Sequence, residues 1–355
     1  MHETANNTFE PVIGITMGDP GGIGPEVVVK ALADPLLRRQ AKYIIFGLDE
    51  QLEYAADLAE MEPYWLRWSH EKIGRDLPRQ VVVADYDEYA VPAWLHQPSL
   101  VSGQASLQFC IDAIDAAKAG ILDAVVTAPI SKESWHLAGA TWPGHTELLA
   151  DRCHCPRKVM MFVAGPLKMA LATIHEALFE VRHKFTIGRV FEPIDLLNDA
   201  LKTYFGVAHP KIAVCGLNPH AGESGQFGDE EHRIISPAIL LAQEAGIDCC
   251  GPFPADTLFL KAAQAQSPWD GVVAMYHDQG LIPVKLLAFD KAVNVTIGIP
   301  IIRTSPAHGT AFDIAGKGIA NENSMKEAIR VAIQMARIKK QNLLKGQTCA
   351  DQTGH

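Results

Sequence analysis

Short runs of β-branched residues alternate with longer amphipathic segments along most of the 355-residue chain. Runs such as residues 12–17, 43–46 and 124–128 have the length and composition of buried strands. The segments between such runs, for example residues 103–119, carry apolar residues at helical spacing. This alternation is typical of parallel sheets covered by helices, and it predicts an α/β fold with mostly parallel sheets.

The length of the chain and its 48% hydrophobic content allow two hydrophobic cores, and a second set of strand and helix units begins at about residue 137. Further strands are expected at residues 80–84, 158–163, 169–174, 211–217 and 272–276, and a helix at 230–245. Residues 61–79 and 85–99 are rich in Pro, Trp and charge, and we interpret them as excursions from the regular pattern. Ser324, with Glu327 three residues on, predicts a capping box at the start of a final helix.

The composition narrows the class of partner and the compartment. A net charge of -10 argues against a general affinity for nucleic acid or for an anionic membrane. The seven cysteines include no C-x-x-C pair, which favours free thiols in a reducing cytosol. The N-terminus is polar and no apolar run is long enough to span a bilayer. We therefore expect a cytoplasmic protein whose partners are small molecules.

Three of the expected strands lead into a histidine, namely His175, His220 and His277. Ligands of open α/β sheets bind at the carboxyl ends of the strands, so these side chains can converge. Each histidine alone is more often the polar cap of a strand than a metal ligand. Three imidazoles together leave an open coordination position and suit Zn, Co or Ni better than Ca. Their shared position therefore predicts a catalytic metal site.

Carboxylates follow or lie near these histidines in the sequence. Glu223, Asp256 and Asp278 are candidates for orienting the imidazoles or for contacting a substrate. A role as a turn or helix-capping residue is an equally good interpretation of Glu223 and Asp278.

A set of basic and polar residues could receive a phosphate and a carboxylate. The set comprises His145, Thr146, Lys285, Asn294 and Arg303. Arginine offers a planar fork for anionic oxygens and lysine a point charge, so a substrate with two anionic ends would use both.

Two glycine-bearing segments suggest a dinucleotide. Residues 18–24 do not match the spacing of the Rossmann fingerprint and are a weak signal alone. Residues 308–321, with the sequence HGTAFDIAGKGIAN, are the more telling segment.

Several blocks of this sequence, taken in order, resemble the 4-hydroxythreonine-4-phosphate dehydrogenase family of vitamin B6 biosynthesis, which is related to isocitrate and isopropylmalate dehydrogenases. The blocks are residues 14–26, 127–132, 144–147, 215–223, 251–257, 276–280 and 303–305. The likeness runs from Gly14 to about Arg337. It implies a first α/β domain from residues 1–136 and 300–355, and a second from 137–299. It also implies an active site in the cleft and at the interface of a homodimer.

The resemblance also implies roles for individual residues. His175, His220 and His277 would bind a divalent metal (Zn, Co, Ni, Mn or Mg), with both subunits contributing to the site. His145, Thr146, Lys285, Asn294 and Arg303 would contact the substrate. Residues 308–321 look like the adenosine-binding loop of isopropylmalate dehydrogenases, so Gly18, Asp19, His308, Asp313 and Asn321 are expected to bind NAD or NADP.

The implied reaction is NAD-dependent oxidation of 4-(phosphooxy)-L-threonine, followed by decarboxylation to 3-amino-2-oxopropyl phosphate. Asp256 and Lys285 are the candidates for the group that takes the hydroxyl proton. Relatives that act on D-threonate or D-erythronate 4-phosphate, and form dihydroxyacetone phosphate, would need the same motifs. The sequence therefore leaves that alternative open, and a non-catalytic metal-binding or ligand-binding protein is a third.

Overall fold

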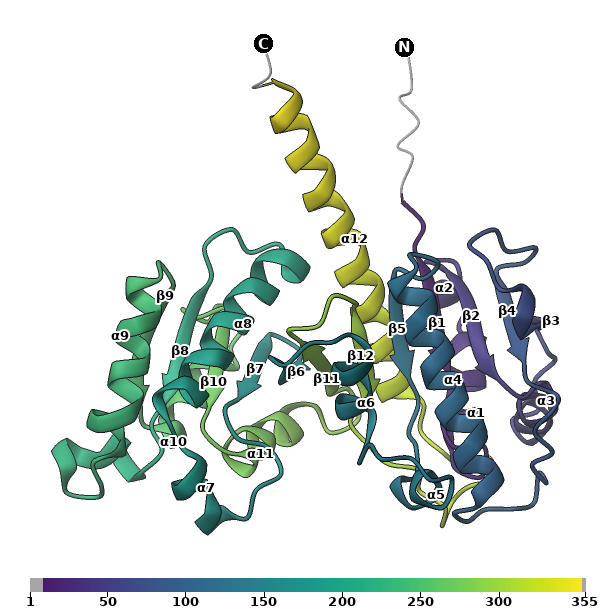
Figure 1. The fold of residues 1–355 in the computed structure, drawn as a ribbon, viewed down its shortest axis with the longest axis horizontal. Helices are drawn as coiled ribbons and strands as arrows, with labels where there is room; N and C mark the ends of the chain where they lie inside the picture. Colours follow the sequence, from purple (N-terminus) through teal and green to yellow (C-terminus); the bar gives the residue numbers. More distant parts are fainter. Residues whose placement is uncertain (1–8, 353–355) are drawn as a thin grey trace. The chain divides into compact units, whose positions relative to one another are not determined.

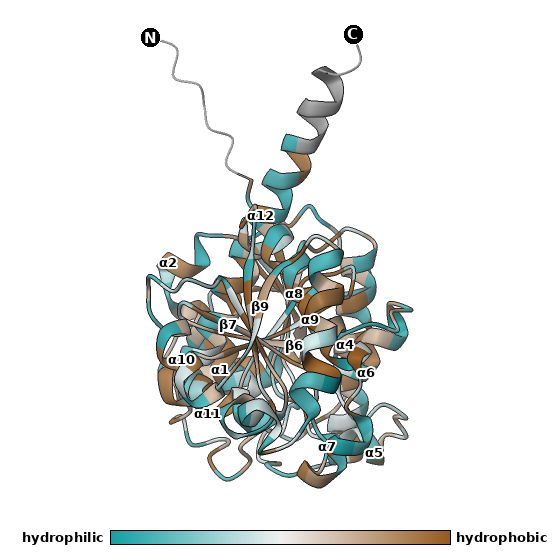
Figure 2. Cartoon of the chain, turned by 90° about the vertical axis from the view of Figure 1, so that its left-hand side faces the viewer, coloured by the Kyte–Doolittle hydropathy of each residue, from teal (hydrophilic) through white to brown (hydrophobic). Residues whose placement is uncertain are grey.

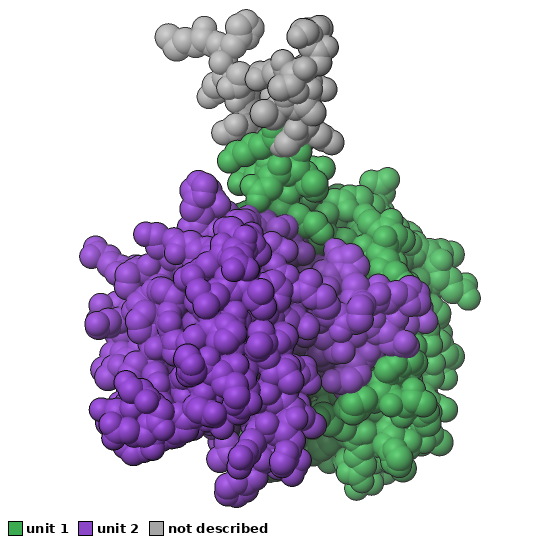
Figure 3. Space-filling view, turned by 60° about the vertical axis from the view of Figure 1, so that its left-hand side comes forward, with its two compact units in different colours: residues 1–143, 309–322, 329–355 green, residues 144–308, 323–328 purple. Residues whose placement is uncertain are grey.

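The computed structural model describes residues 9–352, which form two compact units (Figures 1 and 3). Unit 1 comprises the described part of residues 1–143, 309–322 and 329–355, and unit 2 comprises residues 144–308 and 323–328. The boundaries expected from the sequence, near residues 137 and 300, lie a few residues before the boundaries between these two units. The second boundary moves because a strand after residue 300 pairs with a strand of unit 2.

The described residues of unit 1 form a parallel sheet with the strand order β3-β4-β2-β1-β5. The strands are β1 (Val12–Thr16), β2 (Lys42–Gly47), β3 (Leu66–Ser69), β4 (Val81–Asp85) and β5 (Ala124–Thr127). The helices are α1 (Gly24–Ala33), α2 (Pro35–Arg38), α3 (Asp49–Leu58), η1 (His70–Lys72), α4 (Leu100–Lys118) and α5 (Lys132–Leu137). Every residue of β1, β4 and β5 is buried, as expected where helices cover a parallel sheet. Figure 2 colours each residue of the chain by its hydropathy, from hydrophilic (teal) to hydrophobic (brown).

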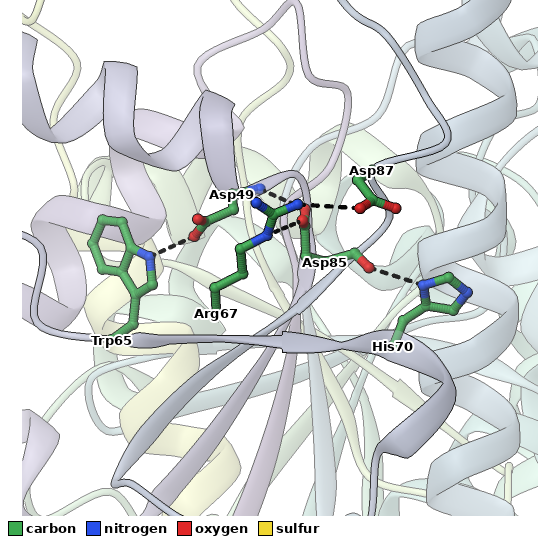
Figure 4. A network of polar contacts seen from close by, with 6 residues as sticks. All are labelled: Asp49, Trp65, Arg67, His70, Asp85 and Asp87. Carbon is green, nitrogen blue, oxygen red and sulfur yellow. Dashed lines mark hydrogen bonds and ion pairs between the residues drawn. The ribbon is translucent and has the colours of Figure 1, made fainter.

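The edge strand β3 lies inside a segment that the sequence pattern marked as irregular, so that interpretation was wrong for these residues. A polar network fixes the strand in place (Figure 4). Arg67 donates to the buried Asp85 over 2.6 Å, and the Trp65 indole donates to Asp49 over 2.8 Å. Burial is the main cause that raises the pKa of Asp49. These partners are far apart in the sequence, which is why no local pattern revealed the strand.

Unit 2 contains a mixed sheet with the strand order β12-β11-β6-β7-β10-β8-β9 among its described residues. The strands are β6 (Val159–Ala164), β7 (Leu167–Leu171), β8 (Lys211–Cys215), β9 (Asp248–Phe253), β10 (Gly271–Ala274), β11 (Val293–Ile297) and β12 (Arg303–Pro306). Strands β7, β10, β8 and β9 pair in parallel, and the pairs β6·β7, β11·β6 and β11·β12 are antiparallel. The predicted α/β class with mostly parallel strands is therefore confirmed.

The helices of unit 2 pack on this sheet. They are α6 (His145–Arg152), α7 (Leu178–Lys184), α8 (Ile187–Phe205), η2 (Pro219–Gly225), η3 (Glu231–Ile235), α9 (Ser236–Glu244), α10 (Ala255–Ala262) and α11 (His277–Ala288). Helices α8 and α11 both contact the central strands β7 and β10. These helix contacts therefore hold the segments that follow the carboxyl ends of β7 and β10.

The last helix, α12 (Asn323–Gln352), contributes Asn323–Ala328 to unit 2 and its remaining residues to unit 1. Ser324 does not form the predicted capping box. Its hydroxyl accepts the N–H of Ala307 over 3.2 Å and donates to the Ala292 carbonyl over 3.0 Å, which ties the helix start to the β11 and β12 region.

Two further expectations concern the whole of the described chain. No disulfide joins the six cysteines whose side chains the structure describes, and Cys349 lies outside that set. Within residues 9–352, none of the helices combines the length and the hydropathy that a bilayer crossing requires.

Candidate functional site

The three strands that lead into histidines lie side by side in unit 2. Strand β10 pairs in parallel with β7 on one side and with β8 on the other. The carboxyl ends of neighbouring parallel strands meet at one edge of a sheet, so the segments that carry His175, His277 and His220 all begin at that edge. The sequence alone could not show that these strands are neighbours, because β8 and β9 separate β7 from β10 along the chain.

Two of the histidines line one cavity. The ring centroids of His175 and His277 are 5.9 Å apart, and both side chains border a cavity of about 300 Å³. The loop below them is held by Thr173, whose hydroxyl donates to the Met275 carbonyl over 2.7 Å. Glu176, which also lines this cavity, accepts the N–H of Ile174 over 2.9 Å.

A carboxylate orients each of two predicted ligands. His220 Nδ1 lies 2.6 Å from Glu223 Oε2, and His277 Nδ1 lies 2.7 Å from Asp278 Oδ1. The hydrogen bond that Glu223 accepts from the ring is the main cause that raises the pKa of His220, and Asp256 contributes a smaller attraction. With Nδ1 engaged in this way, Nε2 is the ring nitrogen left for a metal. The donor set therefore fits a metal whose ligands are held by carboxylates.

The described side chains do not show the three predicted ligands gathered around one point. Across the side chains that the structure describes, no three His, Cys, Asp or Glu residues gather closely enough to hold a metal ion. The grouping of His175, His220 and His277 around one ion therefore stays a prediction.

Three of the predicted substrate residues cluster in unit 2. The antiparallel register of β11 and β12 places Thr296 opposite Arg303, so Asn294 and Arg303 share one face of the sheet. Arg303 is buried and donates to Thr296 Oγ1 over 3.2 Å. Burial, and then the positive charge of Arg303, lower the pKa of His145 well below its usual value. This group places a fixed positive charge beside a neutral imidazole, which suits an anionic oxygen.

Asn294 adds a polar atom to the same face. Its Oδ1 atom is buried and has no hydrogen-bond partner within the described structure. Buried polar atoms are rarely left without a partner, so an orphaned oxygen at this place points to a group that arrives with a ligand. Thr146 follows His145 in the first turn of α6 and is half-buried.

The two candidates for the proton-accepting group lie on α10 and α11. Asp256, in the first turn of α10, lines a second cavity of about 310 Å³ together with Tyr276, Asp278 and Ile282. Tyr276 and Asp278 also line the cavity of His175 and His277. Lys285 lies exposed on α11 and is not among the residues that line either cavity.

The segments expected to bind the dinucleotide lie side by side in unit 1. The N–H of Ile23, in the loop before α1, donates to the carbonyl of Thr310 over 2.9 Å. Gly18 and Asp19 are buried, and Asp19 accepts the N–H of Gly21 over 2.9 Å. Burial is the main cause that raises the pKa of Asp19. Both residues shape the loop, and their contact with a cofactor stays a prediction.

A buried ion pair attaches the loop of residues 309–321 to α1, and sequence reasoning missed it. Lys30 Nζ lies 2.6 Å from Glu26 Oε1 and donates to the Gly318 carbonyl over 2.7 Å. Glu26 Oε1 also accepts the N–H of Ala320 over 2.7 Å. The only available signal was a charged pair at i and i+4 on a helix that otherwise reads as apolar. Asp313 and Asn321 lie exposed on this loop, and His308, half-buried, precedes it.

His96 is a second residue that sequence reasoning missed, because it lies in the irregular segment 85–99. Its Nδ1 atom is 3.3 Å from the Gly21 carbonyl. A Cβ at Gly316, where φ is +72°, would come within 2.1 Å of His96 Nε2. His96 therefore packs between the glycine-rich loop and the loop of residues 309–321.

A family model described as "Pyridoxal phosphate biosynthetic protein PdxA" matches residues 39–332 of this chain. The chain belongs to this family. A 4-hydroxythreonine-4-phosphate dehydrogenase from Trichlorobacter lovleyi is 44% identical over 338 residues, which cover 93% of this chain and 99% of the relative. A D-threonate 4-phosphate dehydrogenase from Cupriavidus necator is 43% identical over 337 residues, which cover 92% and 98%.

The fold of this PdxA family member also matches solved structures. A crystal structure of a 4-hydroxythreonine-4-phosphate dehydrogenase from Burkholderia phymatum is similar with a TM-score of 0.78 and 42% identity, covering 93% of this chain and 98% of that one. The family resemblance drawn from the sequence blocks is thus confirmed. The two curated relatives carry different substrate names at nearly equal identity, so identity does not select the substrate.

Proposed function

We propose that this protein is a metal-dependent dehydrogenase that oxidises 4-(phosphooxy)-L-threonine with NAD or NADP and releases carbon dioxide from the resulting keto acid. The observation that carries the proposal is the pair of carboxylate-oriented histidines, His220 with Glu223 and His277 with Asp278, at one edge of the sheet in unit 2. Family membership and the name of the relative from Trichlorobacter lovleyi support the same reaction.

The chain's own residues bind and orient the substrate in this proposal. Arg303 is buried, so its charge is weakly screened and can hold an anionic end of the substrate strongly. His145 stays neutral beside it, because burial and Arg303 lower its pKa, and it can therefore donate or accept a hydrogen bond without adding charge. The orphaned Oδ1 of Asn294 would accept a hydrogen bond from the substrate.

Proton transfer needs a group near the reacting hydroxyl. We propose Asp256, because it lies in the cavity next to the paired histidines and near enough to His220 to affect its pKa. Lys285 is the alternative on α11. A bound divalent metal would supply a positive charge that lowers the pKa of the substrate hydroxyl, and bound NAD would supply the hydride acceptor.

We also propose that the protein is a homodimer, as the family resemblance implies. Apolar side chains are exposed next to the predicted ligands: Phe179 is 89% exposed on α7, and Ile282 and Leu286 are 58% and 83% exposed on α11. Exposed apolar groups of this size are typical of surfaces that pack against a partner. We propose that a second copy of the chain covers them and that both copies contribute to the metal site.

The second candidate substrate class is D-threonate or D-erythronate 4-phosphate, favoured by the name of the relative from Cupriavidus necator. It differs from the first in bearing a hydroxyl where 4-(phosphooxy)-L-threonine bears an amine. The deciding experiment supplies each phosphorylated acid with NAD or NADP at a fixed metal concentration and follows formation of the reduced cofactor. Turnover of the threonate or erythronate ester alone would exclude the first candidate.

A third alternative is a protein that binds metal and ligand without catalysis. The same experiment tests it, because metal-loaded protein that turns over none of these substrates would favour binding without chemistry.

A further inference from the structure

The segment that carries His220 has an unusual backbone. His220, Ala221, Glu223 and Ser224 all have positive φ, at 54°, 54°, 42° and 57°, and Gly222 between them has φ of 81°. Five consecutive residues in the left-handed region are unfavourable, because the Cβ of each non-glycine residue crowds the following carbonyl. Such a turn persists only where surrounding contacts hold it.

One buried side chain holds the segment that leads into this turn. Glu231, the first residue of η3, is 6% exposed, and its Oε1 accepts the N–H groups of both Leu217 and Asn218 over 2.7 Å. Its Oε2 accepts from the Asn218 side-chain amide over 3.0 Å. The Asn218 carbonyl in turn accepts the N–H of Ala221 over 3.1 Å, which links this cluster to the left-handed turn.

The carboxylate also lies against the turn itself. A Cβ at Gly222 would come within 2.7 Å of Glu231 Oε2, so the backbone and the carboxylate are in close contact there. The turn brings His220 Nδ1 to Glu223 Oε2, although an ordinary right-handed helix would also place residues three apart on one side. The left-handed backbone of the turn therefore sets the direction in which His220 and Glu223 point at the sheet edge.

We infer that Glu231 is a positioning residue whose carboxylate holds the left-handed turn of residues 220–224 and thereby presents His220 to the metal. The inference rests on the proposed function for the metal, but the hold on the turn can be measured without it. Glu231 contacts neither the substrate residues nor His220 directly in the hydrogen bonds described above, so it acts through the backbone.

The test uses Glu231→Gln in the full-length protein. The amide keeps the shape of the side chain but replaces one acceptor oxygen with a donor, so it cannot satisfy all three N–H groups. We expect the amide hydrogens of Leu217 and Asn218 to exchange at least tenfold faster in the metal-free protein. We expect Co²⁺, titrated into metal-free protein and followed by its absorption, to bind about 10- to 100-fold more weakly.

Two further variants separate the hold on the turn from general effects. Glu230→Gln makes the same change in charge at the neighbouring residue, which contacts only the Asn218 side chain over 2.7 Å in the described hydrogen bonds, and it should weaken Co²⁺ binding less than twofold. Adding Ser224→Gly to Glu231→Gln should restore much of the Co²⁺ affinity, because glycine adopts positive φ without strain.

Equal losses of affinity in Glu230→Gln and Glu231→Gln would overturn the inference, as would unchanged exchange at Leu217 and Asn218. Failure of Ser224→Gly to restore affinity would also count against it. Failure of the proposed metal site would give another result: wild-type protein and His220→Ala would then bind Co²⁺ with the same affinity. Faster exchange in Glu231→Gln would in that case still show that the carboxylate holds the turn.

Discussion

Replacement of Arg303 by methionine tests the substrate pocket most directly. Arg303 is 3% exposed, so water screens its charge poorly, and methionine keeps much of the volume without the guanidinium. A hydrogen bond to a charged group contributes about 1.5–3 kcal/mol, and about 1.4 kcal/mol corresponds to a tenfold change in affinity. We therefore expect the KM for the phosphorylated substrate to rise roughly 10- to 150-fold, with a smaller effect on kcat, in steady-state assays of the metal-loaded enzyme.

A matched control isolates the charge. Thr296→Val removes the acceptor of the Arg303 hydrogen bond, which spans 3.2 Å, and leaves the guanidinium in place. We expect its KM to change much less than that of Arg303→Met, because the guanidinium charge stays in the pocket and the lost hydrogen bond joins Arg303 to the protein rather than to the substrate. If Arg303→Met and Thr296→Val raise KM equally, the charge of Arg303 does not bind the substrate and the pocket is assigned wrongly.

The same variant has an effect on a neighbour that can be measured without substrate. Arg303 is the second cause, after burial, of the low pKa of His145. Removing the positive charge should raise the pKa of His145, while burial still keeps it below its ordinary value. An NMR titration of the His145 ring proton in metal-free Arg303→Met and wild type measures this shift, and a pKa that falls instead would contradict the geometry.

Three further predictions follow from the other parts of the site. His277→Ala should abolish turnover but leave the melting temperature of the metal-free protein within a few degrees of wild type. The reason is that the side chain lies after a strand end and is only half-buried. Turnover at the wild-type rate would refute the metal assignment. Glu26→Gln should destabilise the protein by about 1.5–3 kcal/mol, measured by urea unfolding, because it removes the buried carboxylate that pairs with the half-buried Lys30. It should also weaken NADH binding, which fluorescence titration measures. If the proposed homodimer packs through α11, Ile282→Asp should yield monomers in sedimentation velocity and lose activity, because the charge would lie in the proposed interface. An active dimer would place the interface elsewhere.

The α/β class could be predicted because each strand and each helix has a recognisable pattern within its own stretch of sequence. A run such as Val12–Thr16 is apolar over the length of one strand, and helical spacing follows in the next segment, so no distant contact is needed to recognise either. The strand-end histidines were visible for the same reason. Family blocks such as residues 215–223 then suggested a shared role, because several blocks in order rarely recur by chance.

Local patterns failed where distant contacts decide the structure. Strand β3 is recognisable only once Arg67 meets Asp85 and Trp65 meets Asp49. Ser324 and Glu327 fit the pattern of a capping box, but the Ser324 hydroxyl is taken by Ala307 and Ala292 instead. In both cases a tertiary partner competes with the local preference and prevails.

The same distinction between local patterns and tertiary contacts applies to the candidate site. The sequence by itself determined which residue types are available, namely the histidines with their nearby carboxylates and the buried arginine of β12. Only the tertiary structure decided that β7, β10 and β8 are neighbours, and that Glu231 holds His220 in a left-handed turn. A left-handed turn of four non-glycine residues has no local signature, because local sterics oppose it and a buried carboxylate from the next segment stabilises it.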